Sequence, residues 1–217
     1  IANAGIGMLS MAGNHMSDCG PEGIADTIAG LDHLGIAHAG AGLTLAAARR
    51  PAFADRHGRR VALLSYNCVG PEIGWAGDRT AGSAYLRIDT ADGSPITPTA
   101  PLERVSEQAL AMLAADIAAV RSQADLVLVA LHKGLVHVPA RLAPYERPLA
   151  HAAIEAGADA VIGHHAHIVR GIEFHRGRPI FHGLGNGCVV TNALSPGQDH
   201  PARAAWAQRR KTLFGFE

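Results

Sequence analysis

Cysteine is scarce in this chain of 217 residues, and the three cysteines, Cys19, Cys68 and Cys188, are far apart with no CxxC pair. An odd number of widely spaced cysteines argues against a disulfide framework and against a cysteine-ligated zinc site. The pattern instead favours reduced thiols, as in a cytoplasm. Localisation itself stays open, because the chain starts without Met or a signal sequence and we expect further residues to precede Ile1.

Long apolar runs and an excess of charge are also missing. No run approaches the roughly 20 apolar residues that a membrane-spanning helix needs, so we expect no membrane segment. The 19 basic and 19 acidic side chains balance. A neutral chain has no electrostatic preference for nucleic acid or an anionic membrane, and we expect neither as a partner.

Helix-like and strand-like segments alternate along most of the chain, which predicts a layered α/β domain. A hairpin turning at "HRGR" predicts mixed rather than purely parallel sheets. The tail after residue 192 is expected to form a separate helical segment, 193–217. We expect helices over 21–36, 106–124 and 145–156, strands over 59–67, 125–132 and 158–165, a hairpin over 171–186, and a loop over 70–104 with a short strand at 84–88.

Three of the apolar segments end in polar residues that can bind metals. The first ends in Asn14-His15, the second in His132-Lys133, and the third in the stretch "VIGHHAH", residues 161–167. Ligands of open α/β sheets bind at the carboxyl ends of the strands, so these side chains are expected to converge.

The spacing within the third stretch makes the prediction more specific. In an extended strand His165 and His167 project to the same side, whereas His164 points the other way. Together with His132 and the amide of Asn14, they would suit one or two ions of Zn, Mn or Fe. A purely structural histidine cluster is the alternative that the residues leave open.

Several stretches resemble one protein family. "MLSMAGNHMSDCGPEGIADTIAGLDHLGIAHAGAG", "LHKG" and "AHAAIEAGADAVIGHHAHIVRGIEFHRGRPIFHGLGN" resemble the CapA family of capsule and poly-γ-glutamate synthesis proteins, from the first residues to about Asn192. That family is similar in fold to the calcineurin-like metallophosphoesterases. The resemblance implies an αββα sandwich over residues 1–192, incomplete at its N-terminus, with a site for two divalent metal ions.

The resemblance also implies individual roles. Asn14 and His132 would bind one ion, and His165 and His167 would each bind a metal, one on each ion. His15 would be the catalytic acid or a phosphate contact. Asp18 and Gly20 would complete the NH-x-x-D-x-G pattern and hold the loop. Apart from the resemblance, His164 and Asn186 are candidates for supporting the substrate or the loops, and a turn role for Asn186 is equally open.

Three departures from the family pattern matter. The aspartate motifs that supply a bridging carboxylate have no counterpart here and are expected upstream of Ile1. Lys133 stands where relatives commonly have an aromatic residue, and Cys19 where a tyrosine is frequent.

The leading functional hypothesis is a dinuclear-metal hydrolase of phosphoester type, in which two divalent ions activate water and hold the phosphoryl oxygens. A metal-dependent peptide epimerase on the same fold is the alternative, with Cys19 or a histidine as base. A non-catalytic component of polymer assembly is the third hypothesis. A polyanionic polymer usually binds to a basic surface, but this chain is neutral, and its basic stretches at 49–60 and 209–211 are interpreted as solvated surface. The substrate would accordingly be a small molecule, a polymer or a peptide.

Overall fold

The computed structural model describes residues 2–97 and 99–187. The chain divides into two compact units, Ile1–Gly185 and Asn186–Glu217. This division precedes the predicted boundary at 192, and the helix expected over 193–217 lies outside the described residues. The elements are 3₁₀ helices η1 (Ala2–Ala4) and η2 (Glu72–Gly74), helices α1 (Gly20–His33), α2 (Leu45–Ala48), α3 (Glu107–Arg121) and α4 (Glu146–Glu155), and strands β1 (Met8–Ser10), β2 (Ala37–Ala39), β3 (Ala41–Gly42), β4 (Ala52–Arg56), β5 (Arg59–Asn67), β6 (Gly82–Ser83), β7 (Ile88–Thr90), β8 (Leu102–Val105), β9 (Leu126–Lys133), β10 (Ala160–His165), β11 (Ile172–His175) and β12 (Arg178–Phe181).

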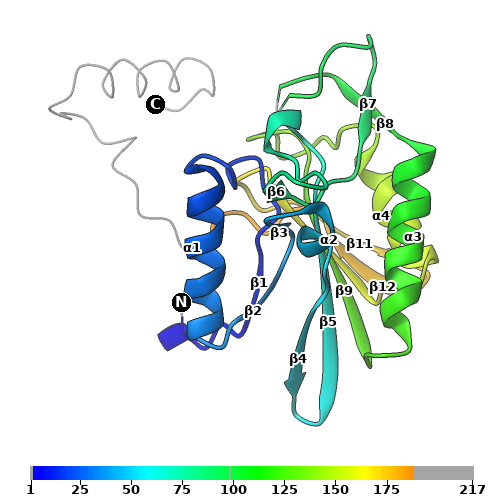
Figure 1. The fold of residues 1–217 in the computed structure, drawn as a ribbon. Coiled ribbons are helices and arrows are strands. Elements are labelled where there is room, and N and C mark those ends of the chain that lie inside the picture. The colour runs from blue at the N-terminus through cyan, green and yellow to red at the C-terminus, as the bar shows by residue number, and fades with distance from the viewer. Residues whose placement is uncertain (1, 98, 188–217) are drawn as a thin grey trace, which may run out of the picture. The chain divides into compact units, whose positions relative to one another are not determined.

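A six-stranded mixed sheet in the order β11-β12-β10-β9-β5-β4 forms the centre of the first unit. β5, β9, β10 and β12 run parallel, and the two edge strands β4 and β11 are antiparallel to their neighbours. Helices α3 and α4 pack on one face, and the small parallel sheet β1–β2 packs on the other, with α1 against β2 (Figure 1). This is the expected α/β sandwich, with mixed sheets.

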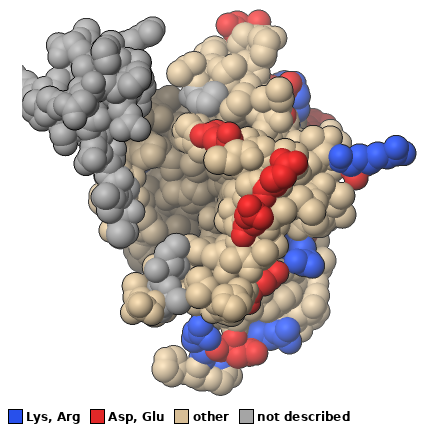
Figure 2. All heavy atoms as spheres, turned by 60° about the vertical axis from the view of Figure 1, so that its left-hand side comes forward, with Lys and Arg blue, Asp and Glu red and all other residues tan. Residues whose placement is uncertain are grey.

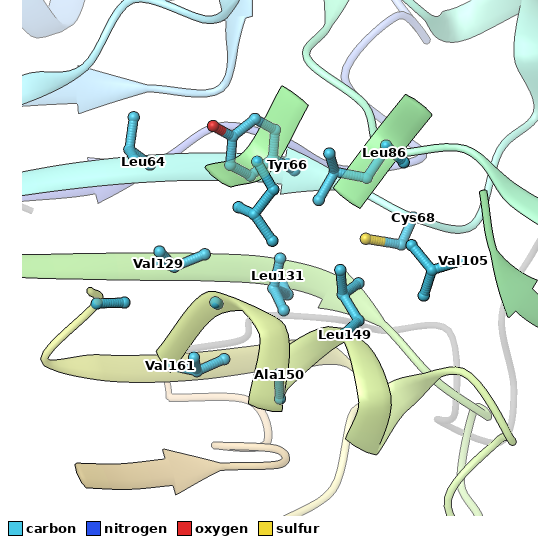
Figure 3. Close-up of a cluster of buried hydrophobic side chains, with 14 of the residues drawn as sticks. Leu64, Tyr66, Cys68, Leu86, Val105, Val129, Leu131, Leu149, Ala150 and Val161 are labelled. Atoms are coloured by element: carbon cyan, nitrogen blue, oxygen red, sulfur yellow. The ribbon is translucent and has the colours of Figure 1, made fainter. Parts of the chain in front are cut away.

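The main core lies between the six-stranded sheet and the two helices (Figure 3). In β9 the residues Val127, Val129 and Leu131 are fully buried toward the helices. Ser106 caps α3 by accepting a hydrogen bond from the backbone N–H of Ala109, so the helix begins where its apolar stripe begins. The continuous apolar run at 126–131 therefore forms the buried parallel strand that it predicts.

The segment at 84–88 is a correction, because it does not form the predicted strand. Only Ile88 belongs to a strand, β7, while Tyr85 forms an isolated bridge with Asn67. Leu86 donates its backbone N–H to the carbonyl oxygen of Asn67 beyond the regular ladder of β5.

Gly163 is a point of close approach between β10 and the segment that follows β12. A Cβ atom at this position would collide with the backbone carbonyl oxygen of His182 and would lie 2.9 Å from that of Phe181. The backbone N–H of Leu184 also donates to the Gly163 carbonyl oxygen at 3.2 Å. Strand β10 is thus held against its neighbour just before its histidines begin.

Charge is distributed evenly on the face that Figure 2 brings forward. Acidic and basic side chains lie scattered there, next to a hollowed area that carries neither. Within the described part of the chain, no helix is long and apolar enough to span a bilayer.

Candidate metal centre

Parallel pairing of β9 with β10 brings the first histidines together. The register places His164 opposite His132, at the carboxyl ends of both strands. Their Nδ1 atoms are 2.7 Å apart, and Nδ1 of His165 is 3.0 Å from Nε2 of His132. His132 therefore contacts two histidines of the neighbouring strand.

Asn14 reaches the same ring from the other layer of the sandwich. It lies in the turn after β1, and its Oδ1 atom is 2.7 Å from Nε2 of His132. Ser10, at the end of β1, lies 3.1 Å from Nε2 of His164 and 2.7 Å from the hydroxyl of Ser65 in β5. The two sheets are thus joined by side chains that surround His132.

The predicted orientation of His164 is wrong. The prediction assumed an extended chain through residue 167, but β10 ends at His165, where φ is +97°, and φ is +59° at His167. Once the backbone enters this left-handed region, side chains no longer alternate as in a strand. His164 and His165 therefore do not lie on opposite sides: His164 contacts His132 through its register in β10, and the turned backbone brings His165 to the same ring. Such conformations are rare outside glycine and cluster at functional sites.

His167 lies at the edge of the cluster. Its ring centre is 6.2 Å from that of His165 and 5.7 Å from that of His137, a residue that the sequence analysis did not single out. The backbone N–H of His137 donates to the Ala166 carbonyl oxygen, which fixes the two loops together. The signal available in the sequence was "HKGLVH", a second histidine shortly after His132.

His15 and Asp18 form an exposed pair in the turn before α1. Nδ1 of His15 is 2.8 Å from Oδ2 of Asp18, so the carboxylate orients the ring. A charge on His15 also disfavours protonation of His132 and His165, and so contributes to lowering both pKa values. His15 is therefore placed to act electrostatically on the same region. Its catalytic role stays a prediction.

Burial keeps the inner rings neutral. Desolvation strongly lowers the pKa of His132, with the neighbouring histidines adding to the effect. It lowers the pKa of His164 to about 4, with a further contribution from Lys133, and that of His165 to about 4, with further contributions from His167, His164 and His15. Neutral imidazoles have a free lone pair at pH 7, which is the form that binds metals.

The donor atoms fit a divalent ion. Oδ1 of Asn14 and Nδ1 of His165 lie 2.7 and 3.0 Å from Nε2 of His132, close to the spacing of about 3 Å between neighbouring ligands with bonds of about 2.1 Å. Nε2 of His165 is buried without a hydrogen-bond partner. Buried polar atoms are rarely left unpaired, so this nitrogen, which is not the one next to His132, indicates an absent partner of its own.

The donor set differs from an ordinary structural metal site. In residues 2–97 and 99–187, no group of three or more His, Cys, Asp or Glu side chains is placed so that it could hold a metal ion by itself. None of the described hydrogen bonds of His132, His164 and His165 involves a carboxylate. The cluster therefore offers imidazole nitrogens and an amide oxygen alone.

Two further candidates are not part of the described cluster. Asn186 belongs to the second unit, and its supporting role stays a prediction. Cys19 is exposed at the N-cap of α1, whereas Cys68 is buried and its thiol pKa is raised to about 12 by that burial. Cys188 lies outside the described residues.

Several known proteins are similar to this chain in sequence. The profile of the family described as bacterial capsule synthesis protein PGA_cap matches residues 1–189. A probable polyglutamine synthesis accessory protein of Mycobacterium tuberculosis is 34% identical over 180 residues, 82% of this chain and 43% of that protein. The capsule biosynthesis protein CapA of Bacillus anthracis is 28% identical over 186 residues, 86% of this chain and 41% of that protein. The PGA biosynthesis protein CapA of Bacillus subtilis is 28% identical over 181 residues. The chain thus spans less than half the length of these relatives.

Proposed function

The chain belongs to the PGA_cap family of bacterial capsule synthesis proteins, and we propose from this premise that it acts in capsule or poly-γ-glutamate synthesis as a metal-dependent hydrolase of phosphoester type. The names of the relatives support the biosynthetic role. The hydrolase activity is supported by the chemistry of the histidine cluster.

The observation that carries the proposal is the arrangement around His132. Asn14, His132 and His165 come from three separate segments, yet their donor atoms lie within 3.0 Å of Nε2 of His132. The rings are held neutral by burial, and Nε2 of His165 has no partner. A structural cluster would be expected to satisfy this nitrogen.

The proposed roles follow from these positions. Asn14, His132 and His165 would hold a divalent ion of Mn, Zn or Fe, and His167 would hold a second. Bound there, the ions would supply Lewis acidity toward the oxygens of a phosphoryl group. His15, oriented by Asp18, would donate a proton to the leaving group.

Metal content tests the proposal. The protein is expressed together with the upstream segment in which the aspartate motifs are expected, purified without chelators, reconstituted separately with Mn, Zn and Fe, desalted and analysed for bound metal. We expect close to two equivalents in the unmodified protein and a loss of at least one in His165→Ala. His33→Ala is the matched control, because His33 is an exposed histidine in the last turn of α1. Equal metal content in all three proteins would contradict the assignment.

Activity is measured on the same preparations. Phosphomonoesters and phosphodiesters are screened first, and candidate peptides are then incubated in D₂O. Hydrolysis that requires both the metal and His15 supports the phosphoester reaction. Deuterium incorporation without hydrolysis would replace it with epimerase chemistry on the same centre, and binding without turnover would leave a polymer-assembly role.

A further inference from the structure

A second cavity lies apart from the atoms that surround His132. It has a volume of about 410 Å³ and lies between the segment that leads into α4 and the hairpin β11–β12. We call it the arginine pocket, because Arg141, Arg147 and Arg170 line it together with Glu173 and His182. The proposed function assigns no role to any of these five residues.

Cationic groups outnumber anionic ones in the wall of the pocket. Guanidinium groups are always charged in proteins, so three positive charges face one carboxylate. That carboxylate is already shared, because Glu173 lies 2.8 Å from Arg147, 2.6 Å from His151 and 3.0 Å from His182. The negative charge of Glu173 is therefore already paired with neighbouring side chains. The remaining positive charge makes the pocket favourable for an anion.

Arg141 has no described anionic partner. It is exposed, and within residues 2–97 and 99–187 it forms no ion pair. It lines the mouth of the pocket from the loop that follows β9. Its five N–H donors are thus free to bind a ligand.

Around Arg170, buried cationic groups also outnumber the carboxylates. It is only 5% exposed, and it donates to both oxygens of the buried Glu146 and to the Leu135 carbonyl oxygen. Glu146 is also bonded by Lys133 at 2.8 Å, so two cations share one carboxylate. The Nε atom of Arg170 is buried without a partner. Burying an uncompensated charge is costly, and a bound anion would reduce that cost.

The rest of the wall is apolar. Pro139, Leu142 and Ile172 line the cavity beside the guanidinium groups. A guanidinium fork pairs bidentately with carboxylate or phosphate, but an apolar wall adds affinity only for a ligand that also carries carbon. A compact inorganic anion would leave this wall unused.

We propose that the arginine pocket is a binding site for a carboxylate-bearing organic ligand. The carboxylate pairs with Arg141 and Arg147 at the mouth, and the aliphatic part of the ligand packs against the apolar wall. The proposal does not depend on the metal centre, because no atom of the pocket contacts the donor atoms around His132 in the described hydrogen bonds.

The test is isothermal titration calorimetry on the 217-residue chain, with glutarate as the probe. Glutaramide, which has the same carbon chain without charge, controls for the carboxylates, and inorganic phosphate tests the other anion. We expect glutarate to bind, glutaramide not to bind, and phosphate to bind more weakly than glutarate. Arg141→Gln should weaken glutarate binding about tenfold, the effect of losing one charge-assisted contact.

Arg79→Gln is the matched control, since Arg79 is exposed and lies outside the pocket. Arg170 is left intact, because its loss would leave Glu146 with one cation fewer inside the fold. Three outcomes would overturn the proposal: no glutarate binding, equal binding of glutaramide, or equal affinity in Arg141→Gln and the unmodified protein. Tighter binding of phosphate than of glutarate would overturn the carboxylate assignment.

Discussion

Replacing Glu146 by Gln should destabilise the protein strongly, because among the described contacts this is the only carboxylate that pairs with the two buried cations Lys133 and Arg170. Glu146 and Lys133 are fully buried, and Arg170 is 5% exposed. The carboxylate accepts from Lys133 at 2.8 Å, from Arg170 at 3.0 and 3.1 Å, and from the backbone N–H of Ala143 at 2.7 Å. Gln keeps the shape and removes the charge.

The expected loss follows from the general cost of breaking a buried ion pair. Removing one partner costs about 3–5 kcal/mol, since the remaining charge is left uncompensated. For a chain of this length that corresponds to a fall in Tm of roughly 6–20 °C. Lys133→Met should cost less than Glu146→Gln, because Arg170 still neutralises the carboxylate in that variant.

The pKa of Glu146 sets the conditions of the assay. Burial by itself raises this pKa, but Lys133, Ala143 and Arg170 lower it overall. A carboxyl whose folded pKa is lowered contributes stability above its unfolded pKa and loses that contribution as the pH falls through the folded value. The comparison is therefore made at neutral pH, where the group is charged.

Equilibrium urea unfolding, followed by circular dichroism and by fluorescence, measures the free energy of unfolding. Coincident transitions establish that one value applies to the whole transition. Glu103→Gln is the control, as an exposed carboxylate in β8 whose loss should change stability by no more than about 0.5 kcal/mol. A loss below about 1 kcal/mol for Glu146→Gln would refute the reasoning.

Two further predictions concern the histidines and the core. Because burial lowers the pKa of His164 and His165 to about 4, below the ordinary 6.5, the unfolded chain binds more protons between these values, and stability should fall as the pH is lowered from 6.5 to about 4. Urea midpoints across this range measure the slope, which His165→Gln should reduce; an unchanged slope would contradict the prediction. Leu131→Ala should cost about 2–5 kcal/mol, because Leu131 is fully buried. Leu126→Ala, at a position 41% exposed in the same strand, should cost clearly less, and equal losses would show that β9 packs differently.

Periodicity predicted the central elements because those segments have one dominant environment. β9 is apolar over residues 126–131, since helices cover one face and a second layer covers much of the other. Helix α3 has one buried stripe with Leu113, Ile117 and Val120. Such patterns are local, so a single sequence contains them. The β11–β12 hairpin turns at residues 175–178 as its "HRGR" stretch predicts.

The resemblance implied a second sheet layer, but periodicity did not locate its strands, because they are too short to have a period. β1 and β2 have three residues each, and β3 and β6 have two. The basic stretch at 49–60, interpreted as solvated surface, includes the hairpin β4–β5, in which Ala52 is buried. Because charged residues gather at the turn of this hairpin, the composition of the stretch did not indicate a strand.

The gathering of candidate ligands was predictable, but their orientation was not. The carboxyl ends of parallel strands meet at one edge of a sheet, and this placed His132 near His164, whereas Asn14 reaches them from β1 in the other layer. The side on which each ring lies depends on φ at His165, which the letters "GHHAH" do not reveal. Backbone geometry of this kind is set by tertiary contacts.

The close approach at Gly163 has an evolutionary consequence. Because any Cβ there would collide with the carbonyl oxygen of His182, every single-codon change away from glycine separates β10 from the β12 segment. The next residue, His164, contacts His132, so a displacement would move the ring cluster as well. A saturation mutagenesis survey should therefore find that Gly163 tolerates substitution poorly, although glycine has no side chain that could take part in chemistry. We therefore expect glycine at this position in related proteins whose hairpin sequences differ, and we expect more variation in the loops around it.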